Sequence, residues 1–81
     1  PFNPVTRIEF ALPEAGLASL KVFNIMGQQV ATLVNQQLSA GRHTVRWDAT
    51  NDAGLKVASG MYVYQLEVNG FTQSHKMLLL K

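Results

Sequence analysis

The side chains with the potential for chemistry are few in this 81-residue chain. It has no cysteine, two histidines and five carboxylates. Disulfides, thiol catalysis and Cys-ligated zinc are therefore excluded. General acid–base catalysis needs two titrating groups held in one pocket. The spacing instead places the carboxylates on polar strand faces and in turns: Glu9, Glu14, Asp48, Asp52 and Glu67.

A catalytic triad would have to combine His43 or His75 with a serine and an acid. No serine stands in the sequence context of a nucleophile. His43 is in phase with Val45 and Trp47 along a predicted strand, which favours a packed or edge histidine over a ligand. The sequence therefore predicts a non-catalytic protein without a cofactor.

The segment from Asp48 to Gly54, "DATNDAG", brings oxygen ligands close together and raises the question of a calcium site. An EF-hand needs a longer loop that ends in a bidentate Glu and is flanked by helices, and none of these features is present. Asp and Asn in such loops more often bond their own backbone. We predict no metal site, and metal binding by this loop stays an open alternative.

Three aromatic residues, Trp47, Tyr62 and Tyr64, have the flat faces on which sugars stack. All three alternate with apolar neighbours along strands, where the core of a β-sandwich is expected. A lone Trp in such a domain is usually buried, with its indole N–H bonded nearby. The pattern favours a core over a sugar platform.

Period-two alternation, which is typical of strands, extends over most of the chain. "TRIEFAL" places Ile8, Phe10 and Leu12 on one face, and "MYVYQLEV" repeats the pattern after Ser59-Gly60. Asn69-Gly70 is a strong signal for a type I′ hairpin turn. Residues 35–41 read as a polar connection anchored by Leu38.

No window shows a capped helical stripe. About seven short strands are expected, joined by Gly, Pro and Asn turns. They predict an all-β fold, an antiparallel β-sandwich of the immunoglobulin or fibronectin III kind.

Composition indicates one globular domain spanning residues 1–81, with 47% hydrophobic and 15% charged residues. The formal charge is +2, and its lysines and arginines are scattered in sequence. Neither nucleic-acid binding nor membrane insertion is expected. The chain begins at Pro1 without a methionine or a leader, so we expect it to be a fragment from the C-terminal end of a larger secreted protein.

The last segment, "KMLLLK", departs from alternation. Its four consecutive apolar side chains predict a strand that is either covered on both faces or offers one face to a partner. We therefore assign partner recognition to this segment: Lys76, Met77, Leu78, Leu79, Leu80 and Lys81.

Five stretches in register resemble the type A C-terminal sorting domain of bacterial type IX (Por) secretion. They are "PFNPVTRIEFALPEAG", "LKVFNIMGQQVATLV", "LSAGRHTVRWDAT", "VASGMYVYQLEV" and "KMLLLK". That family is in turn similar to the immunoglobulin-like domain of the flagellar hook-capping protein. The resemblance covers essentially the whole chain.

The resemblance implies a sorting domain that directs the export of a large protein of the Bacteroidetes or their relatives. Its expected partners are an outer-membrane type IX translocon and a sortase-like peptidase. The expected location is the periplasm in transit, then the cell surface or the exterior. The family blocks match here at Gly27-Gln28 and Ser59, and at residues to which the resemblance assigns structural roles: Gly27, Gly41, Trp47, Asp48, Gly60 and Tyr62.

Two other functions are compatible with these residues. One is a structural immunoglobulin-like spacer or assembly module, and the other is a carbohydrate-binding module of a polysaccharide hydrolase. The second requires exposed, coplanar aromatic rings. The sequence leaves open the cargo, the cleavage site, the translocon-contact surface and the oligomeric state.

Overall fold

The computed structural model describes residues 6–80, which form two β-sheets without a helix. Alternating apolar residues and the turns between them account for strands β1, β2 and β5. The strands are β1 (Thr6–Leu12), β2 (Gly16–Asn24), β3 (Gln29–Leu38), β4 (Gly41–Trp47), β5 (Gly60–Val68) and β6 (Phe71–Leu79).

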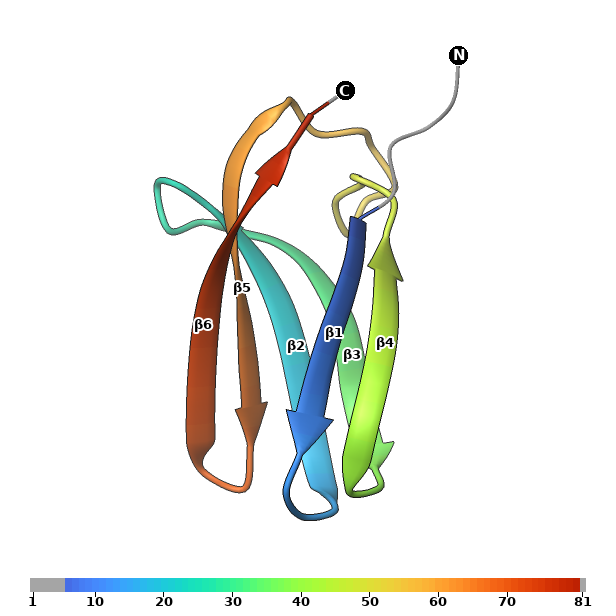
Figure 1. The fold of residues 1–81 in the computed structure, drawn as a ribbon. Helices are drawn as coiled ribbons and strands as arrows, with labels where there is room; N and C mark the ends of the chain where they lie inside the picture. Colours follow the sequence, from blue (N-terminus) through green and yellow to red (C-terminus); the bar gives the residue numbers. More distant parts are fainter. Residues whose placement is uncertain (1–5, 81) are drawn as a thin grey trace.

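The two sheets differ in size. Strands β1 and β4 form a two-stranded antiparallel sheet, and a four-stranded antiparallel sheet has the order β3-β2-β5-β6. Figure 1 shows β1 and β4 together as one layer, with β5 and β6 to one side of it. The predicted all-β sandwich with an immunoglobulin-like fold is confirmed, with six strands among residues 6–80 where about seven were expected.

Alternation places the core where the sequence predicted it. Ile8, Phe10 and Leu12 of β1 face inward, while Arg7 and Glu9 are exposed. Apolar side chains of β2 and β5 meet them from the other sheet. Burial of an apolar side chain of this size contributes roughly 1.5–3 kcal/mol. The buried residues on these two strands are Ala18, Leu20, Val22, Tyr62, Leu66 and Val68.

Residues 35–38 differ from the expectation of a polar connection. Strand β3 continues to Leu38, because Gly16 pairs with Leu38 and Ser19 with Asn35. The backbone of these polar residues therefore pairs with β2, although their side chains are mostly exposed. The true connection to β4 is only Ser39 and Ala40, before Gly41 opens the next strand.

The turn between β5 and β6 has the predicted conformation. Asn69 and Gly70 both have positive φ, 51° and 76°, as a type I′ turn requires. The Asn69 side-chain amide also donates to the Ala15 carbonyl at 3.2 Å, which connects this hairpin to the turn before β2. The start of β1 and the end of β6 lie at the opposite end of the sandwich, and at the same end as each other (Figure 1).

Candidate interaction surface on the C-terminal strand

Trp47 is a core residue, as predicted. Its side chain is 1% exposed, and its indole N–H donates to the Thr50 carbonyl at 2.9 Å. Tyr62 packs against it edge-to-face, with the ring planes at 72°. The Tyr62 hydroxyl donates to the Ala58 carbonyl at 2.6 Å. Both polar atoms are thus satisfied inside the fold.

This geometry bears on the carbohydrate-binding alternative. Trp47 and Tyr62 are buried and cross at 72°, so they offer no coplanar exposed faces. Tyr64 is half-buried and stacks on His75 with 5.3 Å between ring centroids. These three rings do not form the platform that a sugar site requires.

His43 is half-buried, whereas His75 is exposed on the edge strand β6. His43 stacks on Phe10, with ring centroids 5.5 Å apart, and its Nε2 lies 2.8 Å from the Ser39 carbonyl, to which it can donate. His75 stacks on Tyr64.

Asp48 shapes the loop that follows Trp47. The Thr50 hydroxyl donates to Asp48 Oδ1 at 2.6 Å. That hydrogen bond, assisted by the charge of Lys56, holds the pKa of Asp48 below its ordinary value of 3.8. Asp48, to which the resemblance assigns a structural role, thus accepts a local hydrogen bond from Thr50, two residues along.

The loop oxygens that raised the question of calcium are occupied by the chain itself. Asn51 Oδ1 accepts from the amides of Ala53 and Leu55, each at 3.0 Å. Asp52 Oδ1 accepts from the Thr32 amide at 2.9 Å. Within residues 6–80, no three His, Asp or Glu side chains are gathered so as to hold a metal ion.

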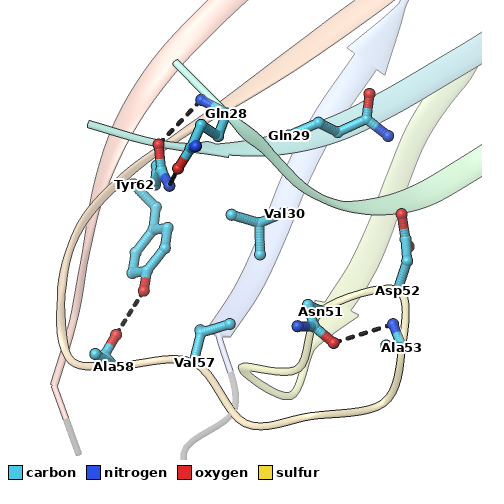
Figure 2. Close-up of a pocket in the computed structure, with 10 residues that line it drawn as sticks. Gln28, Gln29, Val30, Asn51, Asp52, Ala53, Val57, Ala58 and Tyr62 are labelled. Atoms are coloured by element: carbon cyan, nitrogen blue, oxygen red, sulfur yellow. Dashed lines mark hydrogen bonds between the residues drawn. The ribbon is translucent and has the colours of Figure 1, made fainter. Parts of the chain in front are cut away.

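An open cleft of about 650 Å³ lies between the β2–β3 turn and the loop that contains Asn51. Figure 2 shows Gln28, Val30, Asn51 and Tyr62 around it, with the Tyr62–Ala58 and Asn51–Ala53 hydrogen bonds dashed. The neighbouring Asn24 Oδ1 accepts from the amides of Met26 and Gln28. These hydrogen bonds hold together the turns that border the cleft.

The three glycines to which the resemblance assigns structural roles all have positive φ. Gly27, Gly41 and Gly60 have φ values of 81°, 119° and 153°. They lie in the β2–β3 turn and at the first positions of β4 and β5. Ser59 precedes Gly60 at the entrance to β5.

The C-terminal segment divides into two faces. Leu79 is 2% exposed and belongs to the core cluster around Trp47, and Met77 is half-buried beside it. Lys76, Leu78 and Leu80 point outward, with Leu78 57% and Leu80 71% exposed. Partner recognition was assigned to the whole segment, but Leu79 lies in the core, because the β-pleat resumes its alternation there. Lys81 lies outside the described residues.

Leu78 belongs to a larger apolar surface that sequence spacing alone did not identify. Leu78 pairs with Met61, and Val63 pairs with Phe23. Phe23, Ile25 and Val63 line a shallow groove of about 450 Å³. We call this surface the outer apolar patch; it consists of Phe23, Ile25, Met61, Val63 and Leu78.

The patch lies beside an unpaired strand edge. Strand β6 ends the order of the four-stranded sheet, and no other strand among residues 6–80 pairs with its outer side. Free N–H and C=O groups on such an edge are a template for another extended segment. Residues 6–80 include no helix that is long and apolar enough to cross a membrane.

Comparisons with known proteins agree with the fold. Residues 4–73 match the family described as the FlgD Ig-like domain. The structure of FlgD from P. aeruginosa aligns with a TM-score of 0.70 and 22% identity over 93% of this chain. That of FlgD from Xanthomonas campestris, a protein whose hook capping is essential for flagellar assembly, aligns with a TM-score of 0.73 and 20% identity over 95% of this chain.

The chain spans only 60% and 56% of those two structures' own chains. At this level of identity the two structures show the fold alone. No curated protein matches the chain.

Proposed function

Because the chain belongs to the FlgD Ig-like domain family, we propose that it is a non-catalytic structural module that contributes a protein-binding surface to a larger assembly. The observation that carries this proposal is the outer apolar patch beside the unpaired edge of β6. Exposed apolar surface that is contiguous across three strands is typical of interaction sites. The role requires no reacting group.

The contact is expected to combine two kinds of interaction. A partner strand that extends the sheet at β6 gains main-chain hydrogen bonds, and its side chains cover Leu78 and Met61. Lys76, opposite Val63, provides a positive charge at the margin of the patch. Apolar burial supplies affinity and the marginal charge supplies orientation.

Site-specific photocrosslinking in the source organism tests this proposal. A crosslinking residue at position 78 is expected to give one adduct of defined mass. The same residue at position 55 is the matched control, because Leu55 is 64% exposed but lies outside the patch. Met61→Lys should remove the position-78 adduct. Equal adducts at both positions, or none at position 78, would contradict the proposal.

A second candidate function is the type IX sorting domain that the sequence resembles. The family match ends at residue 73, within β6. Lys76, Leu78 and Leu80 therefore lie beyond it, exposed along an edge strand. Under this proposal the module directs a cargo through the outer membrane to the cell surface, and the translocon reads these residues.

The test of this second function is delivery. Residues 1–81 are appended to a periplasmic reporter in a host with type IX secretion, and surface-exposed reporter is measured. Delivery should fall sharply for Leu78→Lys combined with Leu80→Lys, while Leu17→Lys, at another exposed leucine, should have no effect. Absence of delivery by the unaltered chain would exclude sorting and leave the assembly role standing.

A further inference from the structure

All three arginines of the chain meet on one surface, although they are scattered in sequence. Arg7 of β1 pairs directly with Arg46 of β4, and Ala11 pairs with Arg42. The three side chains are exposed on the outer face of the two-stranded sheet, opposite the core side chains of the same strands. We call this surface the arginine face. Folding brings these charges together from segments some 35 residues apart in the chain.

The arginine face contains the whole net charge of the protein. Its single acid is Glu9, so the face has a formal charge of +2, and the four lysines elsewhere are balanced by four carboxylates. Arg46 also borders a cavity near Asp48 and Asp52. Those two carboxylates are bonded to Thr50 and to the Thr32 amide. Like charges directly opposite each other on paired strands are destabilising.

The same sheet has free edges. It consists of β1 and β4 alone, and no further strand among residues 6–80 pairs with either of them. A hollow of about 290 Å³ lies across both strands, bordered by Glu9, Phe10, Ala11, Arg42, His43 and Thr44. An extended segment laid along the free edge of β4 would gain main-chain hydrogen bonds on one side.

From these two features we propose that β4 is a docking site for an acidic, extended strand of a partner protein. Arg42 and Arg46 are four residues apart on one face, which is about 13 Å along a strand. Acidic side chains at alternate positions of the added strand would lie opposite them. Its other side chains would cover His43 and Val45, which are half-buried on the inner face.

The charges on β1 and β4 indicate which edge the partner strand uses and which kind of strand binds there. Strand β1 carries Glu9 on the same face, which would repel an acidic strand, whereas β4 carries no acid. A second copy of this chain is disfavoured, because antiparallel self-pairing centred on Thr44 would place Arg42 opposite Arg46. This surface lies on the other sheet from the outer apolar patch, so the inference is independent of the proposed function.

The test uses a short blocked peptide of alternating Glu and Val, with the 81-residue chain labelled for NMR. We expect binding that weakens as salt is raised, with slowed hydrogen exchange at alternate amides of β4. Arg42→Gln combined with Arg46→Gln should weaken binding by about tenfold or more. Lys21→Glu lowers the net charge by the same amount on the other sheet and should leave the affinity unchanged.

Three outcomes would overturn the proposal. The first is absence of binding at low salt. The second is that the alternating peptide binds no more tightly than polyphosphate or a peptide of the same composition with Glu and Val in separate blocks. In that case the amides of β4 would also show no slowed exchange. The third is unchanged binding by the arginine double variant. Arg42→Lys combined with Arg46→Lys keeps the charge, and its amide spectrum shows whether the fold survives substitution on this face.

Discussion

Trp47 shows how one side chain organises the end of the sandwich where the chain enters and leaves. It is buried against Tyr62, and its N–H bonds the Thr50 carbonyl in the loop that follows β4. The residue between these contacts, Ala49, is fully buried and has a positive φ of 63°. Such a backbone is uncommon for Ala. The tryptophan therefore fixes a loop conformation as well as filling the core.

Replacing Trp47 by Phe is expected to lower the free energy of unfolding by about 2–4 kcal/mol. The change leaves a cavity and removes the donor to the Thr50 carbonyl. Urea denaturation measures the loss. Leu55→Ala, at a 64% exposed position, should change stability by less than about 0.5 kcal/mol. A Trp47→Phe variant as stable as the control would show that the core closes without the indole.

The pKa of Asp48 provides a second prediction for single residues. Thr50→Val removes the hydroxyl that is the main cause of the lowered value, so the pKa of Asp48 should rise toward 3.8. Since the folded-state pKa is depressed, its contribution to stability is present above pH 3.8 and is lost as the pH falls below that value. Carboxyl-carbon NMR titration measures the pKa. Thr44→Val, on the outer face of β4, should leave it unchanged, and an unshifted pKa in Thr50→Val would refute the assignment.

At the level of elements, alternation and turn chemistry predicted most of the fold from the sequence. The inward faces of β1 and β5 were assigned correctly, with Tyr64 only half-buried, as was the Asn69-Gly70 turn. These faces comprise Ile8, Phe10 and Leu12, and Tyr62, Tyr64, Leu66 and Val68. The extension of β3 through polar residues was missed, because at an exposed edge strand backbone pairing alone defines the strand.

Site prediction succeeded where a residue's own strand determines its environment. The burial of Trp47 follows from its neighbours along β4, and so does the packing of His43. The outer apolar patch and the arginine face depend instead on cross-strand partners, such as Met61 with Leu78 and Arg7 with Arg46. Sequence periodicity gives the face of a residue, but only the strand order and register give its neighbours.

The β5–β6 turn gives a prediction that separates backbone strain from packing. A Cβ added at Gly70 would meet no atom within 4 Å, but φ there is +76°. Gly70→Val should therefore cost about 1–2 kcal/mol through the backbone alone. Gly70→Asn is the matched control, because Asn tolerates this conformation, and it should cost distinctly less. Thermal unfolding compares them, and equal losses would argue against a type I′ turn.

The two faces of β6 give a further prediction at this scale. Leu79→Ala should lower the free energy of unfolding by about 2–5 kcal/mol, because its side chain is 2% exposed within the core around Trp47. Leu78→Ala, one position earlier and 57% exposed, should cost much less. Chemical denaturation of the two variants compares one residue type on opposite faces. Similar losses would mean that Leu78 is covered within the domain.

In the molecule as a whole, the two sheets differ in how many hydrogen-bonded neighbours their strands have. Strands β2 and β5 each pair on both sides, whereas β1 and β4 pair only with each other. The turns β2–β3 and β5–β6 join neighbours in the larger sheet, but the β1–β4 pair joins distant segments. Local opening should therefore begin in the smaller sheet.

Native-state hydrogen exchange tests this ranking. Paired amides of β1 and β4 are expected to exchange through openings of lower free energy than those of β2 and β5, because the smaller sheet is held by a single ladder of hydrogen bonds. Arg7→Thr relieves the repulsion with Arg46 and should raise protection in β4 selectively. Uniform protection across both sheets would mean that the fold opens only as one unit.

The positions of the first and last strands determine how the domain would be attached to neighbouring polypeptide. The start of β1 and the end of β6 lie at the same end of the sandwich, while the three turns before β2, β4 and β6 lie at the far end (Figure 1). Polypeptide attached before β1 and after β6 would leave from this same end of the sandwich. The domain would then project sideways from that polypeptide, with the edges of β4 and β6 accessible along its sides.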